Sequence, residues 1–150
     1  MNPINVKKNI QKAIQSVPKL IEKTVKDLKL EEINRENLLQ GKDSEGNDMP
    51  FYSLSEYGMN KRQRNPRNRG RWDLKDTGQF HQNIFTHKIK SYVTFKNKLR
   101  SKKFESIMRK MEVANREPMG IPQKEITRLL EEKRPEIKKK IEDIIAGKNV

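Results

Sequence analysis

Apolar residues between positions 4 and 30 recur at the three- and four-residue spacing of an amphipathic helix, with lysines between them. Pro18 falls inside this stripe. Because proline lacks a backbone donor and its ring collides with the preceding turn, we expect a kink or break near Ser16, whose side chain can cap the restarted helix. Residues 31–40 extend the helical part, and Gly41 is a natural stop. The stripe consists of Ile10, Ile14, Val17, Ile21, Val25 and Leu28.

The helical period disappears after Gly41. Turn-forming residues between positions 43 and 50 predict a loop or short hairpin that leads to an aromatic anchor at Phe51 and Tyr52. Further along, residues 83–100 contain period-two stretches that are rich in β-branched and aromatic types, with Phe85, His87 and Ile89 alternating and then Val93 and Phe95. This alternation predicts two antiparallel strands that turn near Lys90 and Ser91.

Two helices are predicted in the last third of the chain. Residues 102–111 place four apolar side chains on one side, and prolines and a glycine separate this helix from the next. Residues 124–147 carry an apolar stripe that ends at Gly147, although Pro135 predicts a break within it. The apolar positions are Phe104, Ile107, Met108 and Met111 in the first helix, and Ile126, Leu130, Ile137, Ile141 and Ile145 in the second.

These patterns together predict an α+β fold. A small antiparallel β-sheet is flanked by a long kinked N-terminal helix and a C-terminal helix, with an extended basic loop. The length of 150 residues fits a single domain, because two cores of half this size would each be marginal. Its parts are the N-terminal helical part (1–40), the extended and basic arm (41–71), the β segment with a short helix (72–115) and the C-terminal helix (116–150).

Composition adds a constraint on the core. Only 32% of residues are apolar and 36% are charged, so the core is thin, and we expect extended arms or an obligate assembly. The formal net charge of +14 favours association with polyanions or acidic protein surfaces. No apolar run approaches the roughly 20 residues that span a bilayer, and the first residues lack the apolar centre of a signal peptide, so we expect no membrane contact.

Metal and cofactor sites have little support in the sequence. The chain has no cysteine and two histidines, which disfavours a zinc site. Asp43, Glu45 and Asn47 alternate as in an EF-hand loop, but Gly46 stands at the fourth position of that loop instead of the sixth, and Leu54 replaces the glutamate at the twelfth. A solvated turn is the favoured interpretation, and no cofactor is predicted.

Catalytic groups are equally weak candidates. Asp76, Thr77 and Gly78 form the Asp-Thr-Gly triplet of aspartic proteases, but here the triplet follows a basic run and precedes a polar one. We favour a helix cap, in which the Asp76 carboxylate accepts amide hydrogens from Gly78 or Gln79. His81 and His87 lie in no recognisable nucleophile motif. The sequence therefore predicts a protein that is not an enzyme.

A dense basic run precedes that triplet. Its composition predicts a mobile surface loop, which is either an arm that contacts phosphates or acidic surfaces or simply a solvated segment. Nearby aromatic residues could stack on single-stranded nucleic acid, although a thin core needs Trp72, Phe80 and Phe85 inside. The cations are Lys61, Arg62, Arg64, Arg67, Arg69 and Arg71, and the aromatic residues are Tyr52, Tyr57, Trp72, Phe80 and Phe85.

The order of these features is similar to that of a known family. "DSEGNDMPF" at 43–51 resembles a D-x-x-G turn before an aromatic and a proline, with that pair in reversed order. "LKDTGQFHQNIF" at 74–85 resembles an L-x-D-T-G-x-L/F segment followed by an apolar pair. "REPMGIP" resembles an R-x-P-aromatic-x-G-I/L turn, with Met119 where an aromatic is common. The residues that carry these matches include Leu74, Asp76, Thr77, Gly78, Phe80, Arg116, Pro118 and Gly120.

This arrangement resembles the virion morphogenesis and tail-completion proteins of tailed bacteriophages, which form the neck between head and tail. The resemblance spans about residues 1–147 and implies a structural protein that assembles head-to-tail into a homo-oligomeric ring, a hexamer or dodecamer, in the virion neck after synthesis in the host cytoplasm. Neighbouring neck, portal-side and tail proteins are the implied partners. A ring also explains the thin core, because each subunit completes its burial against neighbours.

Within such a neck the cations at 61–71 would face either the DNA path, with transient contact to genomic DNA, or an acidic collar on the adjoining ring. Too strong a grip on DNA would impede ejection, so we favour protein docking. The alternative hypothesis is a basic nucleic-acid-binding protein that acts alone through the segment from Lys61 to Arg71, for which a steep salt dependence of binding is the expected signature.

Overall fold

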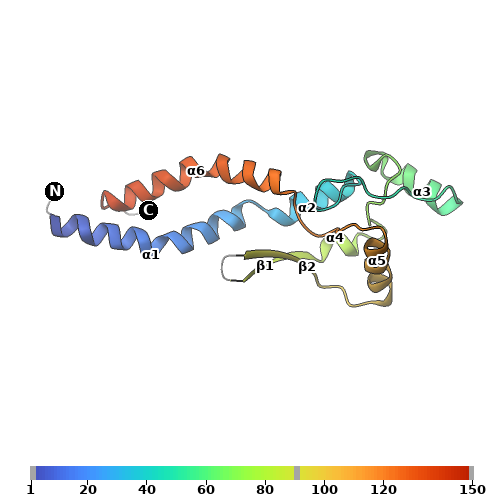
Figure 1. The fold of residues 1–150 in the computed structure, drawn as a ribbon, viewed down its shortest axis with the longest axis horizontal. Helices are drawn as coiled ribbons and strands as arrows, with labels where there is room; N and C mark the ends of the chain where they lie inside the picture. Colours follow the sequence, from blue (N-terminus) through green and yellow to red (C-terminus); the bar gives the residue numbers. More distant parts are fainter. Residues whose placement is uncertain (1–2, 90–91, 149–150) are drawn as a thin grey trace. The chain divides into compact units, whose positions relative to one another are not determined.

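The computed structural model describes residues 3–89 and 92–148 and confirms the predicted α+β class (Figure 1). The N-terminal part is helical, one two-stranded antiparallel sheet follows, and a long helix closes the chain. The elements are α1 (Pro3–Asp27), α2 (Leu30–Leu39), α3 (Glu56–Arg64), the 3₁₀ turn η1 (Pro66–Asn68), α4 (Gln79–Gln82), β1 (Ile84–Ile89), β2 (Tyr92–Asn97), α5 (Lys102–Val113) and α6 (Gln123–Ile145).

The chain divides into two compact units. The helical unit comprises residues 1–29 and 124–150 and holds α1 with nearly all of α6. The central unit comprises residues 30–123 and holds the remaining elements. This division does not test whether the chain folds as one domain, so the single-domain organisation stays a prediction.

Helix α1 runs through Pro18 without a break, and Figure 1 shows it bent but continuous. Of the kink or break expected near Ser16, the helix shows a bend and no break, which confirms the predicted kinked N-terminal helix. The Ser16 hydroxyl does not cap a second helix, because it donates to the Ala13 carbonyl (2.8 Å) inside the same one. The interruption comes later, at Lys29, where φ is +49° and α2 begins at the next residue.

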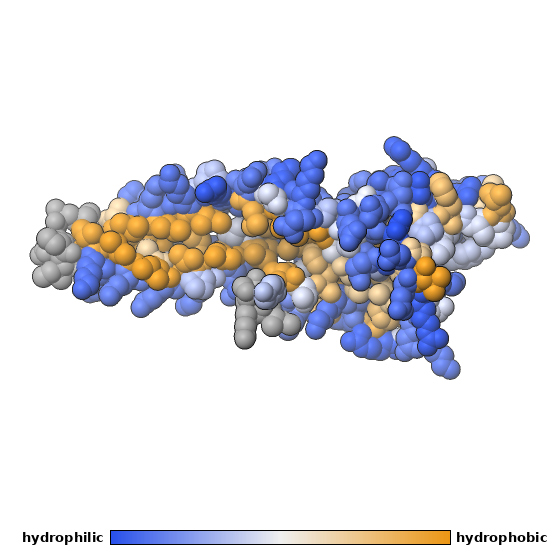
Figure 2. All heavy atoms as spheres, viewed as in Figure 1, coloured by the Kyte–Doolittle hydropathy of each residue, from blue (hydrophilic) through white to orange (hydrophobic). Residues whose placement is uncertain are grey.

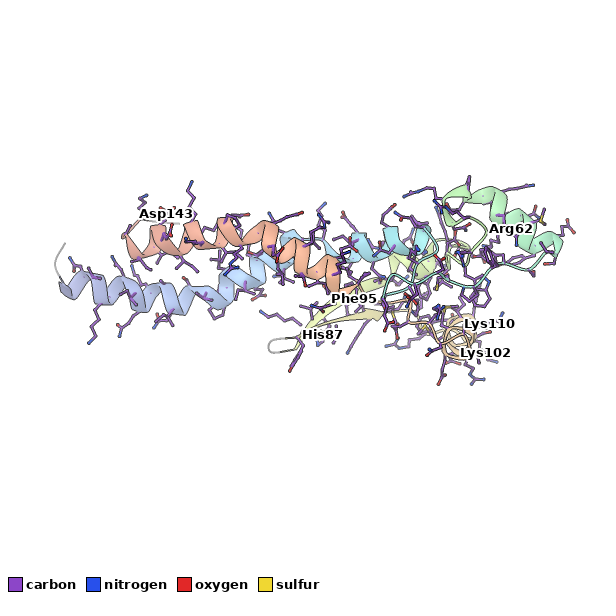
Figure 3. The ribbon with its side chains drawn as sticks, turned by 45° about the horizontal axis from the view of Figure 1, so that its top comes forward. Arg62, His87, Phe95, Lys102, Lys110 and Asp143 are labelled. Atoms are coloured by element: carbon purple, nitrogen blue, oxygen red, sulfur yellow. The ribbon has the colours of Figure 1, made fainter. Side chains whose placement is uncertain are left out.

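Helix α6 is likewise continuous across Pro135, so the break predicted there is wrong. It ends as predicted at Gly147, where φ is +80° and the amides of Gly147 and Lys148 reach back to carbonyls of the last turn (3.0 and 2.9 Å). Figures 1 and 3 show α1 and α6 side by side and antiparallel within the helical unit. The Asn9 amide donates to the Ile145 carbonyl (3.1 Å) and ties their ends together.

The central unit is built on α2 and the β-hairpin. Gly41 ends α2 with φ +72°, as the sequence predicts, and donates to the Leu38 carbonyl (2.8 Å). Strands β1 and β2 pair antiparallel with Thr86 opposite Phe95, which confirms the predicted hairpin. The turn predicted at Lys90 and Ser91 lies outside the described residues. Arg35 of α2 donates to the His81 carbonyl of α4 (2.7 Å) and to the Ile84 carbonyl at the start of β1 (3.1 Å), which fixes α2 against both elements.

The hydrophobic core of the central unit is small. Its fully buried members come from α2, the following loop, α4, β1 and α5, and half-buried side chains complete it. Helix α5 supplies the side predicted from its pattern, and Trp72 and Phe80 pack inward as expected. The buried members are Leu38, Met49, Phe80, Ile84 and Met111. None of the helices in the described part of the chain combines the length and apolar character needed to span a membrane.

Candidate functional site

The basic run at 61–71 is helical over most of its length and partly buried. Its first residues complete α3, which the Ser55 side chain caps, and η1 follows directly. Asn68 and Gly70 are buried. The prediction of an extended surface loop that buries no face is therefore wrong.

Two of its cations lie inside the central unit. Lys61 is only 4% exposed, and its Nζ donates to the Lys75 carbonyl (2.8 Å) and to the Asp76 carboxylate (2.9 Å). The Arg62 guanidinium donates to the Tyr52 carbonyl (2.8 Å). A buried ammonium is stable only with such partners, so these two cations hold the fold and are not offered to another molecule.

Two more cations pair at the surface of the same unit. Arg67 forms an ion pair with Glu36 of α2. Arg71 pairs with Asp48 (2.9 Å), donates to the Met49 carbonyl (2.9 Å) and stacks over the Phe51 ring (4.2 Å). Of the two residues predicted as an aromatic anchor, Phe51 is exposed and Tyr52 is partly buried.

Arg64 and Arg69 are the remaining cations of the run, and both are exposed. Neither side chain donates a hydrogen bond or forms an ion pair within the described residues, although the charge of Arg69 helps to lower the pKa of Asp48 after the larger effect of the Lys42 hydrogen bond. Of the six cations predicted as an interaction arm, these two are therefore the ones free to meet a partner.

Asp73 is the buried polar centre that organises this region, and the sequence analysis missed it. Its carboxylate accepts from the Tyr52 hydroxyl (2.9 Å), Asn65 (2.7 Å) and Asn68 (3.1 Å). Burial and the nearby Asp73 charge raise the pKa of Tyr52. The asparagines in the basic run were the sequence signal for this site, because side-chain amides can donate hydrogen bonds to a buried carboxylate.

Asp76 does not cap a helix, which corrects the sequence prediction. The N-cap of α4 is Gly78 with φ +85° and no side-chain cap bond, and the Thr77 hydroxyl lies 3.5 Å from the Gln79 amide. Asp76 instead receives hydrogen bonds from Lys103 of α5 and Lys61 of α3, and these lower its pKa to about 2. Asp76 thus links three segments of the central unit electrostatically.

The rest of the Asp-Thr-Gly segment packs into the core. Leu74 takes φ +53° and lies against the core, and the Phe80 ring lies 5.9 Å from the Phe104 ring. His81 is buried with its Nε2 2.6 Å from the Asp73 carbonyl, and burial lowers its pKa, so the neutral ring donates to that carbonyl. This hydrogen bond occupies the nitrogen and makes His81 a structural group.

The other two family-like segments lie against each other. Ser44 of the first turn donates its amide to the Glu117 carbonyl (2.8 Å), and Arg116 donates to the Asp48 carbonyl (3.0 Å). Pro118 and Gly120 are buried, and the Asn34 amide donates to both their carbonyls (3.0 and 2.8 Å). Segments far apart in sequence thus form one hydrogen-bonded framework.

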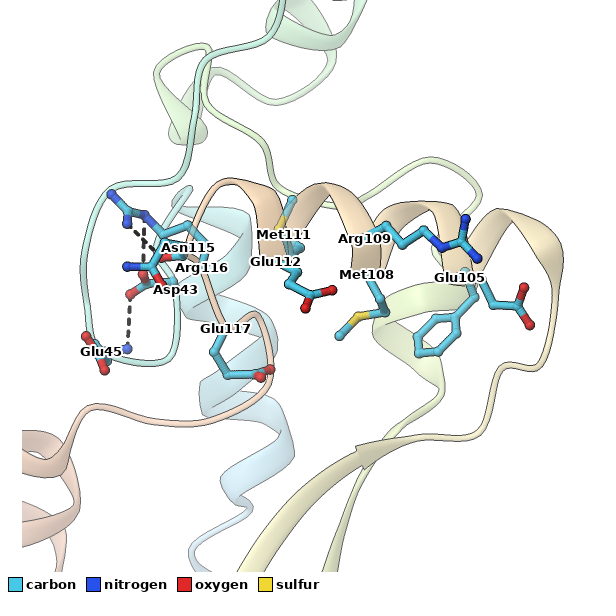
Figure 4. Close-up of a pocket in the computed structure, with 11 residues that line it drawn as sticks. Asp43, Glu45, Glu105, Met108, Arg109, Met111, Glu112, Asn115, Arg116 and Glu117 are labelled. Atoms are coloured by element: carbon cyan, nitrogen blue, oxygen red, sulfur yellow. Dashed lines mark hydrogen bonds and ion pairs between the residues drawn. The ribbon is translucent and has the colours of Figure 1, made fainter.

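An acidic hollow runs along one side of α5 (Figure 4). It has a volume of about 650 Å³, and Arg116 lies with Asp43 at one end while Glu105 and Arg109 lie at the other. The Asp43 carboxylate is occupied by the amides of Glu45 (3.0 Å) and Asn47 (2.7 Å). Within the described residues no group of three or more acidic, histidine or cysteine side chains could hold a metal ion.

A second hollow, the basic groove, lies between α3 and α5 and has a volume of about 490 Å³. Its lining contains four lysines and one aspartate, a net charge of +3, around an apolar wall. The charged members are Lys61, Lys75, Lys103, Lys110 and Asp76, and the apolar and aromatic members are Tyr52, Tyr57, Trp72, Leu74, Ile107 and Met111.

The helical unit presents an apolar face. No residue of α6 is fully buried, and α1 buries only Ala13 and Thr24 among its described side chains. Ile14 is 66% exposed, and Figure 2 shows apolar atoms in a continuous band along this unit. The other exposed large apolar residues of the unit are Ile10, Ile21 and Leu130.

No family model, curated protein or solved structure matches the chain.

Proposed function

We propose that the chain is a structural protein of a tailed-bacteriophage virion, part of the neck that joins capsid to tail, and that it works as a homo-oligomeric ring rather than as an enzyme. The ring assembles in the host cytoplasm and contacts portal-side and tail proteins. The observation that carries the proposal is the apolar face of the helical unit. No stripe residue of its two amphipathic helices is fully buried and four large apolar side chains are exposed, so a neighbouring copy that covers this face would bury them.

Two further features support this role. The three sequence segments that resemble the tail-completion family lie in the central unit, and two of them are hydrogen-bonded to each other through Ser44, Glu117 and Arg116. The cations of the 61–71 run are mostly engaged inside the unit, which favours a framework over a flexible DNA-binding arm. Protein docking through Arg64 and Arg69 remains our proposal for the exposed part.

The direct test is whether the protein co-purifies with intact phage particles and whether the isolated chain forms a ring. Size-exclusion chromatography with light scattering at high salt should show a closed oligomer whose population rises with protein concentration. A protein that stays monomeric at every concentration and never accompanies virions would rule the neck role out.

A second test uses charge reversal. R64E with R69E should give tailless heads while the subunit still folds, because both guanidinium groups are exposed and unpaired within the described residues. K61E should instead prevent normal folding, because the glutamate would lie buried beside Asp76. Normal virions from the double variant would contradict docking through these two arginines.

A further inference from the structure

The basic groove combines an apolar wall with unpaired positive charge. Trp72 and Leu74 are half buried along the segment between α3 and α4, and Ile107 faces them from α5. Tyr57 of α3 is 60% exposed at the edge. The apolar surface continues past Trp72 into a neighbouring hollow that Val113 lines. A large apolar side chain from another molecule would find water-exposed apolar partners here.

The charges around this wall are not all neutralised. Lys61 and Lys103 share the Asp76 carboxylate. Lys75 and Lys110 also line the groove, and neither ammonium group contacts a carboxylate within the described residues. Both are exposed, and Figure 3 shows Lys110 on α5. Two unpaired ammonium groups beside an apolar wall complement carboxylates that flank an apolar side chain.

We propose that the basic groove binds an acidic peptide segment of a partner protein, with a leucine or aromatic side chain against Trp72 and Ile107 and carboxylates on Lys75 and Lys110. The identity of the partner, a neighbouring neck protein, rests on the proposed neck role. The chemistry of the bound segment rests on the groove alone. The groove beside α5 thus adds a second docking surface, separate from Arg64 and Arg69.

A nucleic-acid strand is the competing polyanion, and the wall argues against it. Binding of a single strand relies on successive aromatic platforms with phosphate contacts along a track. Here the aromatic rings of Tyr57 and Trp72 alternate with Leu74 and Ile107, and the third ring, Tyr52, is half buried with its hydroxyl bonded to Asp73. The positive charge of the lining comes from lysines. This surface suits a branched or aromatic side chain better than a row of stacked bases.

The test uses four probes of equal length on the isolated full chain. The first probe is a peptide of aspartates and glutamates around a central Leu-Phe pair. The second replaces the Leu-Phe pair with Ser-Ser, and the third replaces the acidic residues with asparagine and glutamine. The fourth is an oligothymidylate. Trp72 is the only tryptophan, so its fluorescence reports occupancy of the groove directly. We expect the first probe to bind at least about tenfold more tightly than each of the others.

Matched variants locate the binding. K75E with K110E should weaken the acidic Leu-Phe peptides by about tenfold or more, whereas K96E with K102E makes the same change in net charge outside the groove and should leave affinity within about twofold. Circular dichroism melts of both variants should match the parent, because these four lysines are exposed.

Three results would overturn the proposal: no binding of the acidic Leu-Phe peptides, equal weakening by both variant pairs, or tighter binding of oligothymidylate that depends on Lys75 and Lys110. None of them bears on the neck role, which co-purification with virions and ring formation test separately. Conversely, a protein absent from virions that still binds these peptides in the groove would keep the site and lose the proposed partner.

Discussion

At the scale of single residues, buried charged and polar side chains stabilise contacts that a larger apolar core would stabilise in other proteins. Asp73 and Asn34 are buried; Asn34 donates to the Pro118 carbonyl, and Asp73 accepts from the Tyr52 hydroxyl. Lys61 is almost wholly enclosed. Buried polar networks of this kind favour one arrangement, because a misplaced partner leaves a buried donor or acceptor unpaired. They also make particular residues sensitive to small changes.

The Asp76 ion pairs should contribute to stability in a pH-dependent way. The pKa of Asp76 is lowered from 3.8 to about 2 by Lys103 and Lys61. A carboxyl whose pKa is lower in the folded state stabilises the fold above pH 4 and loses that contribution as the pH falls through 2. Because Asp76 is partly exposed, we expect D76N to cost only about 1 kcal/mol at pH 7.

Urea denaturation of the parent and D76N at pH 7 and near pH 2 measures this. The deficit of the variant should shrink towards zero at the lower pH. D27N removes a carboxylate from an exposed position and should change stability little at either pH. A D76N deficit of the same size at both pH values would show that the carboxylate acts through something other than its charge.

Gly120 is a position where any side chain should be costly. A Cβ there would lie 2.7 Å from the Ser44 Cβ, and φ is +155°. G120A should lower the free energy of unfolding by about 2–4 kcal/mol through backbone strain and overpacking. G78A is the control, because Gly78 also has a positive φ (+85°), but its nearest neighbour would be 3.7 Å away. Its loss should be limited to about 1–2 kcal/mol.

The Gly120 contact can be tested by relieving it. S44G removes the obstructing Cβ, so S44G with G120A should recover part of the stability lost in G120A alone, as read from chemical denaturation midpoints. Strictly additive losses in the double variant would mean that the strained backbone, and not the contact with Ser44, sets the cost.

At the scale of elements, the two longest helices each tolerate an internal proline. Such a proline removes one backbone hydrogen bond and crowds the preceding turn, yet α1 and α6 continue across Pro18 and Pro135. From this local cost alone the sequence predicts a kink or break near Pro18 and a break at Pro135. The amphipathic stripes continue on both sides of each proline, and the apolar area that an unbroken helix aligns outweighs the local penalty.

Replacing Pro135 should therefore stabilise α6. Pro135 is exposed, so alanine would restore a backbone donor and raise helix propensity without losing buried contacts. We expect P135A to increase helical ellipticity and to raise the free energy of unfolding by about 1–3 kcal/mol. An unchanged or lower thermal midpoint would indicate that the assembled protein needs the proline's local geometry.

At the scale of the whole molecule, apolar side chains remain uncovered in both units. The helical unit exposes isoleucines along its stripe, and the central unit exposes Tyr57 and Val113 beside the basic groove. Only 32% of the residues are apolar and the net charge is +14, so each large apolar side chain that stays exposed is missing from an already small core. Such exposure is consistent with the proposed ring and with a separate docking surface.

Polar substitutions on the helical unit should abolish assembly. I14D with I21D places carboxylates on the exposed part of α1, and light scattering should then show a monomer at concentrations where the parent forms its oligomer. V113D is the control, because Val113 is 89% exposed on the central unit. Oligomers that persist unchanged in the double variant would place the subunit interface elsewhere.

The sequence by itself determined the α+β class, the β-hairpin, the helix ends at Gly41 and Gly147, and the inward side of α5. These features follow from periodicity and from glycine's tolerance of positive φ, which are local properties. Only the tertiary structure decided which of the 61–71 cations are buried or paired and which groups bind Asp76. Those depend on which distant groups come within hydrogen-bonding distance, and a chain so rich in charge offers many pairings that only folding selects.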